Sequence, residues 1–139
     1  MRRLRWLLAA ALVAACASDA PQPIAYDVDA CAQCRMQITD TRYGAEIVTR
    51  RGKAVKFDAI ECLTEYYKQA AAAGDVRSVW VIDFRRPGTF IPAAGARYLQ
   101  VPGGKSPMGR GLLATATDEG VAELKAALGG TVMRWSDLQ

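Results

Sequence analysis

The hydrophobic and polar positions of the chain change their period several times, and the changes occur twice in the same order. Short runs rich in β-branched residues predict strands, and hydrophobic residues three or four positions apart predict helices. The first half predicts two strands, a helix and a third strand, at residues 45–51, 53–57, 58–73 and 76–84. After a loop, the second half predicts the same order, at residues 97–101, 112–116, 118–128 and 131–135. The loop predicted between the halves covers residues 85–96.

The ends of the two predicted helices carry recognisable signals. Asp58 and Glu61 have the spacing of a capping box at the start of the first helix, and Gly74 follows its end. Thr117 or Asp118 is the expected cap of the second helix, which two glycines follow. Each half reads strand, strand, helix, strand, so we predict an α+β fold of two ββαβ units in one domain. A sheet covered by helices on one side would bury the hydrophobic residues of both units.

The N-terminal region differs in composition from the rest. Residues 1–15 combine arginines with an apolar run that is short for a membrane span, so they predict a secretory signal peptide. The small residues before Cys16 resemble a bacterial lipobox, which predicts that this cysteine becomes the lipidated first residue; an ordinary signal peptide is the alternative. Residues 16–30 are then the lipidated end and a linker, and residues 31–139 are the folded domain. The expected location is the periplasmic face of the membrane, and the alanine after Cys16 favours the outer membrane.

Charge and composition exclude some classes of function. The formal net charge of +4 falls to +1 once the three arginines of the signal peptide are removed. The chain shows no basic stripe with interleaved aromatic residues, so nucleic acid is not an expected partner. It also has no histidine, which argues against an enzyme that uses histidine to carry protons. We therefore expect a binding protein and no catalysis.

Sulfur is the chemistry that remains. Cys31, Cys34 and Met36 lie within one short motif, Cys62 falls in the first turn of the first predicted helix, and Met108 lies in a glycine-rich turn. Three cysteines in an oxidising compartment leave at least one thiol unpaired. If the motif is extended, Cys34 and Met36 face the same side. A thiolate beside a thioether favours copper(I), whereas zinc sites do not use methionine.

Other interpretations of the same residues stay open. Cys31 and Cys34 could form a disulfide with each other, or either of them with Cys62. The CxxC spacing also suits an extracytoplasmic thiol–disulfide redox protein, although the motif here follows a linker and not a strand. Met36 and Met108 could be core residues. The start of a helix stabilises a thiolate at Cys62, and a small buried hydrophobic side chain fits that position equally well.

Several short motifs, taken in order, resemble the NosL family, the nitrous oxide reductase accessory lipoproteins. The motifs are CAQCRM, YGAEIV, FDAIEC, SPMGRG and GGTVMRWSDL, and the similarity extends from about Asp29 to Leu138. The resemblance implies a domain similar to the MerB-like fold. It also implies a periplasmic copper(I) chaperone of denitrification that supplies nitrous oxide reductase and works with an ABC-type membrane transporter.

The resemblance also implies which residues bind copper. By position, the Cys-x-Met element of the family falls on Cys34 and Met36, and the methionine of its Ser-Pro-Met-Gly loop falls on Met108. Cys31 matches a cysteine that is common at the first position of the motif. Cys62, water or a partner would complete the ligand set.

Two positions depart from the family pattern. The residue between the cysteine and the methionine is often glycine, and here it is Arg35. Some members have a histidine two residues after the loop methionine, and here that residue is Arg110. Because arginine has no lone pair to donate, the copper ligands contributed by this chain are expected to be sulfur atoms.

Overall fold

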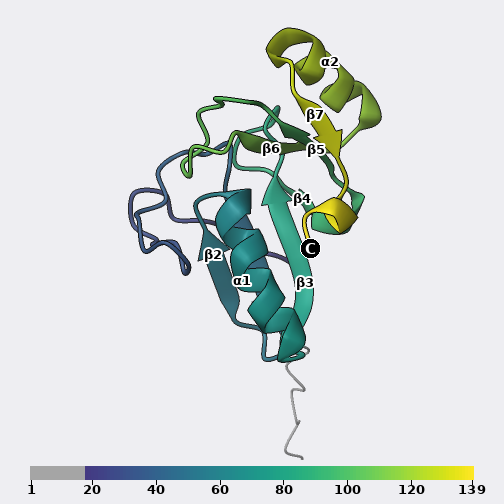
Figure 1. Cartoon of the computed structure of the whole chain (residues 1–139). Coiled ribbons are helices and arrows are strands. Elements are labelled where there is room, and N and C mark those ends of the chain that lie inside the picture. Colours follow the sequence, from purple (N-terminus) through teal and green to yellow (C-terminus); the bar gives the residue numbers. More distant parts are fainter. Residues whose placement is uncertain (1–17) are drawn as a thin grey trace, which may run out of the picture.

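The computed structural model describes residues 18–139, which form two antiparallel sheets and two α-helices (Figure 1). The predicted signal peptide and Cys16 lie outside the described residues. The elements of the first half are β1 (Ala45–Thr49), β2 (Ala54–Phe57), α1 (Ile60–Ala72), β3 (Val76–Ile82), β4 (Phe90–Pro92) and the 3₁₀ helix η1 (Ala93–Gly95). Those of the second half are β5 (Arg97–Gln100), β6 (Leu112–Thr115), α2 (Asp118–Leu128), β7 (Thr131–Met133) and the 3₁₀ helix η2 (Trp135–Asp137).

The predicted repeat of strand, strand, helix, strand is confirmed, and the two halves share a topology. The strand orders are β2-β1-β3-β4 and β6-β5-β7. In each half the first strand therefore lies between its hairpin partner and the strand that follows the helix, and every pair is antiparallel. The prediction of one sheet is wrong, because each half forms its own. The predicted loop at residues 85–96 is also wrong in part, since β4 pairs there with the edge of β3.

Alternate residues of the strands in the first sheet point to opposite faces. Both of these faces are covered by other parts of the chain. On one face Ile47 and Phe57 join Ile60 and Leu63 of α1 in the main hydrophobic cluster. Full burial of a side chain of this size contributes about 1.5–3 kcal/mol to folding. Figure 1 shows α1 lying along this face of the sheet.

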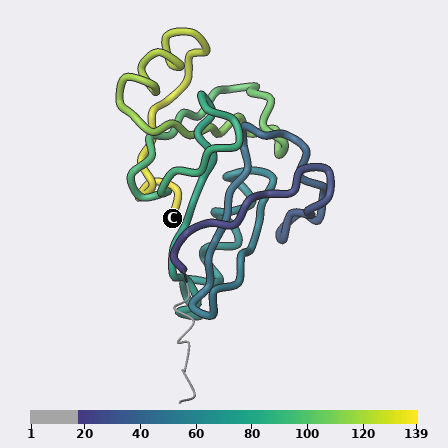
Figure 2. The backbone as a smooth tube through the Cα atoms, turned by 180° about the vertical axis from the view of Figure 1, so that it is seen from behind, coloured from purple at the N-terminus to yellow at the C-terminus, as the bar shows by residue number. Residues whose placement is uncertain are grey.

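The opposite face of the first sheet is covered by the N-terminal segment, residues 18–30, as Figure 2 shows. The indole N–H of Trp80 donates to the carbonyl of Asp19 (3.0 Å), and the backbone N–H of Gln22 donates to Glu46 (2.8 Å). Ile24 is buried and belongs to the main hydrophobic cluster. Much of the segment that the sequence predicts to be linker therefore packs as part of the domain.

The start of α1 differs from the prediction, whereas the start of α2 agrees with it. Ala59 occupies the N-cap position of α1 and no side chain caps the helix, so the capping box predicted at Asp58 is wrong. At α2 the Thr117 side chain accepts a hydrogen bond from the backbone N–H of Gly120 (3.0 Å). No helix within residues 18–139 has the length and apolar character needed to cross a membrane.

The glycine-rich turn between β5 and β6 is held closed by a close backbone approach. The N–H of Val101 donates to the carbonyl of Gly111 (3.0 Å), and the N–H of Gly104 donates to the carbonyl of Val101 (2.9 Å). Gly111 has a φ of +71°, and a Cβ atom there would lie 2.1 Å from the carbonyl oxygen of Val101. The turn that carries Met108 therefore depends on the absence of a side chain at residue 111.

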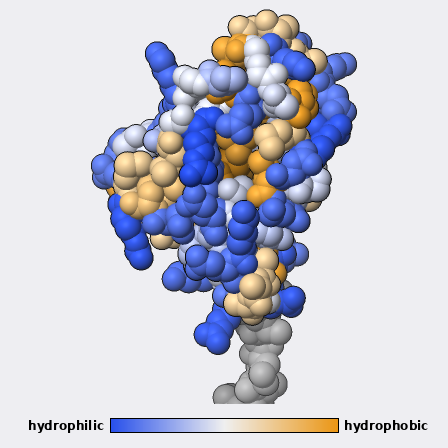
Figure 3. All heavy atoms as spheres, viewed as in Figure 1, coloured by the Kyte–Doolittle hydropathy of each residue, from blue (hydrophilic) through white to orange (hydrophobic). Residues whose placement is uncertain are grey.

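Hydrophobic side chains gather on part of the molecular surface (Figure 3). In the space-filling view most of this face is hydrophilic, and the hydrophobic residues gather around α2 and between the two halves (Figure 3). A smaller buried cluster on the side of the second half contains Tyr43, Leu99, Leu113 and Val121. The two halves thus pack through apolar side chains, as one domain requires.

Substitution of Gly111 by alanine is expected to lower the free energy of unfolding by about 3 kcal/mol, because the added methyl group meets backbone. Gly103→Ala is the matched control, since Gly103 has a φ of +69° but a Cβ atom added there would meet no neighbour within 4 Å. That control should cost about 1 kcal/mol, for the positive φ alone. Urea unfolding measures both, and equal losses would contradict the tight backbone approach.

Replacement of Glu46 by glutamine tests the covered face of the sheet. Glu46 is fully buried, one carboxylate oxygen has no partner among the described residues, and burial raises the pKa of this carboxyl. The folded state then keeps its proton where the unfolded chain, with a pKa of about 4.3, has lost it. Wild-type stability should fall as the pH rises above that value and through the raised pKa.

The glutamine variant lacks this loss, so its stability relative to wild type should increase over the same pH window. Urea unfolding at a series of pH values measures the difference. A difference that stays constant with pH would contradict a raised pKa at Glu46.

Candidate metal centre

Three thiols and one carboxylate meet beside the start of α1. The Sγ atoms of Cys31, Cys34 and Cys62 and a carboxylate oxygen of Asp58 all lie within 4.8 Å of one another. The three cysteines are unpaired, and Cys31, Cys62 and Asp58 are buried. Cys34 is partly exposed, so the cluster reaches the surface through this thiol.

A tight turn places Cys31 and Cys34 in the cluster. The N–H of Arg35 donates to the carbonyl of Cys31 (3.0 Å), and the N–H of Cys31 donates to the carbonyl of Met36 (2.8 Å). The N–H of Ala32 anchors the turn to the carbonyl of Lys56 on β2 (2.9 Å). The extended conformation considered for this motif is therefore wrong, and the turn is what directs the two thiols inward.

The junction of β2 and α1 supplies the other two groups. Asp58 follows β2 directly and Cys62 lies in the first turn of α1, so the two are four residues apart. The Cys34 thiol lies 3.4 Å from Oδ2 of Asp58 and donates a hydrogen bond to it. Oδ1 of Asp58 is buried and has no partner among residues 18–139. A bound cation or its ligand would satisfy this oxygen.

Two of the thiols, those of Cys34 and Cys62, have pKa values above that of a free cysteine in the metal-free protein. Burial raises the pKa of Cys62, and the nearby Cys31 and Asp58 raise it further. Burial also raises the pKa of Cys34, as do its hydrogen bonds to Cys31 and Asp58. The expectation that the helix start favours a Cys62 thiolate is thus wrong, because desolvation outweighs the helix dipole. A metal would have to displace these protons when it binds.

The glycine-rich turn docks onto the same end of α1. The Ser106 hydroxyl donates to Oε1 of Glu61 (2.6 Å), and the backbone N–H of Leu112 points to the same oxygen (3.4 Å). Both Glu61 and Ser106 are buried. Met108 lies two residues after Ser106 and packs, partly buried, against the main hydrophobic cluster that contains Cys31 and Cys62.

One carboxylate joins this turn to the cysteine motif. Oε1 of Glu65 pairs with Arg110 (3.3 Å), and Oε2 accepts a hydrogen bond from the side chain of Gln33 (3.3 Å). The glycine-rich turn and the CAQC turn thus meet across a single side chain of α1. Arg110, at the position where some family members have a histidine, makes an ion pair here.

The candidate ligands chosen from the sequence differ in their positions. Cys31, Cys34 and Cys62 are brought together, whereas the Met36 side chain is 46% exposed and lies at the surface. Asp58 was missed as a site residue because its place before a helix suggested a cap. Its spacing of four residues from Cys62, at the start of a predicted helix, was the available signal.

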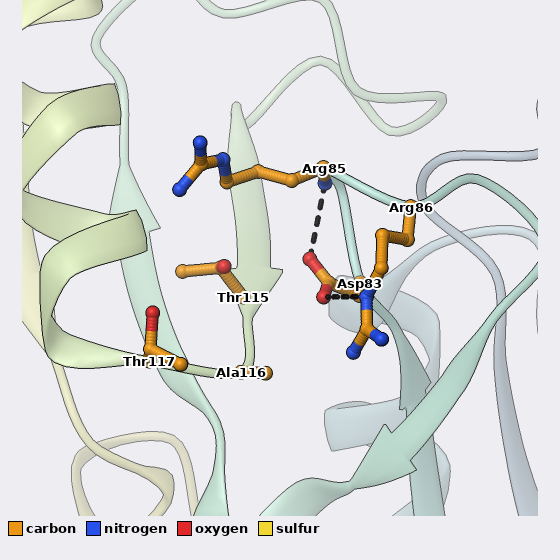
Figure 4. Close-up of a pocket in the computed structure, with 6 residues that line it drawn as sticks. All are labelled: Asp83, Arg85, Arg86, Thr115, Ala116 and Thr117. Carbon is orange, nitrogen blue, oxygen red and sulfur yellow. Dashed lines mark hydrogen bonds and ion pairs between the residues drawn. The ribbon is translucent and has the colours of Figure 1, made fainter.

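A second pocket, of about 420 Å³, lies between the end of β3 and the start of α2 (Figure 4). It is lined by Asp83, Arg85, Arg86, Thr115, Ala116 and Thr117. Asp83 accepts hydrogen bonds from the backbone of Arg85 and the side chain of Arg86, and the Arg85 side chain pairs with Glu123. Both arginines are thus paired with acidic groups, Arg86 with Asp83 and Arg85 with Glu123 outside the pocket lining.

The fold and the cluster together define a small α+β domain with a thiol-rich site that could hold a metal ion. The sequence matches the NosL family over residues 23–139. The chain therefore belongs to the NosL family, as the motifs predicted.

The chain was also compared with solved structures and with curated proteins. The fold is similar to the crystal structure of the copper chaperone NosL from Shewanella denitrificans, with a TM-score of 0.73 and 21% sequence identity. The match covers 85% of this chain and 96% of that one. At this identity the likeness concerns the fold. Comparison with curated proteins finds no match.

Thiol labelling of the reduced, metal-free protein should separate the three cysteines. Cys34 is expected to react first with iodoacetamide, because Cys31 and Cys62 are fully buried. Since the pKa of Cys34 is raised, its rate should keep rising above about pH 9, where a free cysteine has levelled off. Peptide mapping by mass spectrometry measures the order.

In guanidinium chloride the three cysteines should label alike, which is the control for intrinsic reactivity. If Cys62 reacts as fast as Cys34 in the folded protein, the described burial of the cluster is incorrect.

Proposed function

We propose that this protein is a membrane-anchored copper(I) chaperone of the periplasm, with no catalytic turnover. The observation that carries the proposal is the convergence of three unpaired thiols and a carboxylate within 4.8 Å. Thiolates are soft donors that bind copper(I) in preference to hard cations. Membership of the NosL family, and the copper chaperone of similar fold, support the same cargo.

The geometry suits a cargo that must be both held and released. Cys31 and Cys62 supply buried thiols, whereas Cys34 is partly exposed and Met36 lies at the surface beside it. Met108 belongs to a turn that docks on the same end of α1. We assign Cys34, Met36 and Met108 as the ligands at the exposed side. Neutral thioethers there let a partner replace them without separating additional charge.

Two other uses of these thiols are less well supported. Redox proteins that exchange disulfides depend on a thiol of lowered pKa, and here burial raises the pKa of Cys34 and of Cys62. Zinc is a chemical alternative, because three thiolates and a carboxylate also form a tetrahedral zinc set. A copper(I) titration with zinc as the competitor separates these two metals.

The family resemblance and the N-terminal sequence support a proposal for the partners and the location. We propose that the acceptor pathway is the maturation of nitrous oxide reductase, together with an ABC-type membrane transporter. The lipid on Cys16 would hold the chaperone at the membrane, and the alanine that follows favours the outer membrane. Recovery of the wild-type protein in the soluble periplasmic fraction, with Cys16 unmodified, would refute the tether.

Simultaneous replacement of Cys34 by serine and Met36 by leucine should weaken copper(I) binding at least about 100-fold, or about 2.8 kcal/mol. The reason is the loss of one thiolate and one thioether. Competition against a chromogenic copper(I) chelator measures the affinity. X-ray absorption of the copper(I)-loaded wild type should show sulfur neighbours and few or no lighter ones.

Met133→Leu is the matched control, since Met133 is also partly buried but lies on β7, an edge strand of the second sheet, outside the cysteine motif and the glycine-rich turn. It should leave copper(I) affinity unchanged. Equal affinity of the double variant and wild type would reject the ligand assignment, and preferential retention of zinc over copper(I) would reject the cargo.

A further inference from the structure

We propose that the outer edge of β2 binds an acidic, extended segment of the protein that exchanges metal with this chain. The inference rests on the proposed chaperone function for its purpose, but it is carried by separate residues. A strand added there would pair with β2 through its backbone and would meet a cationic groove through its side chains.

The outer side of β2 is open beside Ala54, whereas the cysteine turn already contacts it at Lys56. β2 is an edge strand of the first sheet. The carbonyl of Lys53 accepts from Thr49 of β1, whereas the carbonyl of Lys56 faces outward and accepts from Ala32. Residues two apart in a strand direct their N–H and C=O groups to the same side, so Ala54 also faces outward. Within residues 18–139 no further strand pairs with this side of β2.

A groove of about 460 Å³ runs beside this edge. Its charged lining consists of Arg35, Lys53, Lys56 and Asp29. Lys56 and Asp29 neutralise each other at 2.7 Å, whereas Arg35 and Lys53 are exposed and form no ion pair in the described part of the chain. The groove therefore keeps two uncompensated positive charges, which fit carboxylates on a bound segment.

Arg35 is in a conformation that a residue with a side chain rarely adopts. Its φ is +68°, in the left-handed region that glycine occupies without strain. The exposed side chain makes no ion pair within residues 18–139, so packing and pairing do not account for it. A strained residue at the edge of a functional cluster points to a function for its side chain. A positive charge directly after Cys34 is the property that glycine would lack.

The groove adjoins the metal centre. Cys31 and Ala32 lie in its wall, and Cys34, the most exposed thiol, precedes Arg35 in the chain. A segment bound along β2 would therefore place the partner protein beside the exposed side of the thiol cluster. Lysines on an edge strand also prevent strands of other molecules from pairing with it, and the experiment distinguishes that role from docking.

The test uses a fluorescent octapeptide of alternating valine and glutamate, followed by anisotropy with the purified protein. Charge reversal by Arg35→Glu with Lys53→Glu should weaken binding at least tenfold. The control carries the same change in net charge, Lys68→Glu with Lys125→Glu on the exposed faces of α1 and α2, and should stay within twofold of wild type. Binding should also weaken as salt is raised.

Two further measurements locate the peptide. Amide hydrogen exchange at Ala54 should slow when the peptide is bound, because its N–H becomes a donor to the added strand. Arg35→Gly should leave the protein at least as stable as wild type while lowering its affinity for the peptide. This result would show that the charge of Arg35 serves binding and that its side chain is not needed for the turn.

Several results would overturn the proposal. They are the absence of peptide binding at millimolar concentration, equal loss in both charge-reversed variants, or self-association of the Arg35/Lys53 variant with no change in peptide affinity. The last result would show that Arg35 and Lys53 serve to prevent strand pairing between molecules. Copper(I) titration of the same variants keeps the two proposals apart: retained copper binding with lost peptide binding supports docking. If the wild-type protein binds the peptide but not copper(I), the docking proposal stands and the proposed chaperone function is rejected.

Discussion

One buried side chain, that of Glu61, holds the turn that carries Met108 against the helix that begins beside the metal centre. It accepts a hydrogen bond from the Ser106 hydroxyl at 2.6 Å, and the backbone N–H of Leu112 faces the same oxygen. Burial of a carboxyl group costs free energy that hydrogen bonds offset, so the two contacts to Oε1 fix the turn of the second half to the first helix of the first half. Because Cys62 follows Glu61 and Met108 lies close to Ser106, this contact also sets the spacing of the sulfur-bearing segments.

Local structure was readable from the sequence, and the assembly of the halves was not. The strands and helices follow from periods of two and of three to four residues, and Thr117 caps α2 as predicted. The formation of two sheets depends on which strand edges pair, and that is a long-range choice that the period does not encode. For the site, the short motif revealed Cys31 and Cys34. The role of Asp58 was hidden because an acidic residue before a helix is equally suited to a cap.

Polar burial is concentrated around the site and the sheet next to it. Glu46, Asp58 and Glu61 are buried, and each keeps one oxygen without a partner among the described residues. Such groups cost stability compared with apolar residues. Of these three residues Asp58 lies against the thiols, and burial raises the pKa of Cys34 and of Cys62. The domain thus maintains a region that is unfavourable when empty and protonated, and that a cation would relieve.

The two halves share a topology, but equivalent positions in them carry different residues. The third residue of α1 is Cys62, and the third residue of α2 is Gly120. A Cβ atom at Gly120 would lie 2.6 Å from the Thr115 hydroxyl, so that helix start has no room for a thiol. The repeated unit therefore offers one cysteine position at a helix start and not two. The second unit contributes to the site only through the turn between β5 and β6, which carries Met108 and is held to α1 by the hydrogen bond from Ser106 to Glu61.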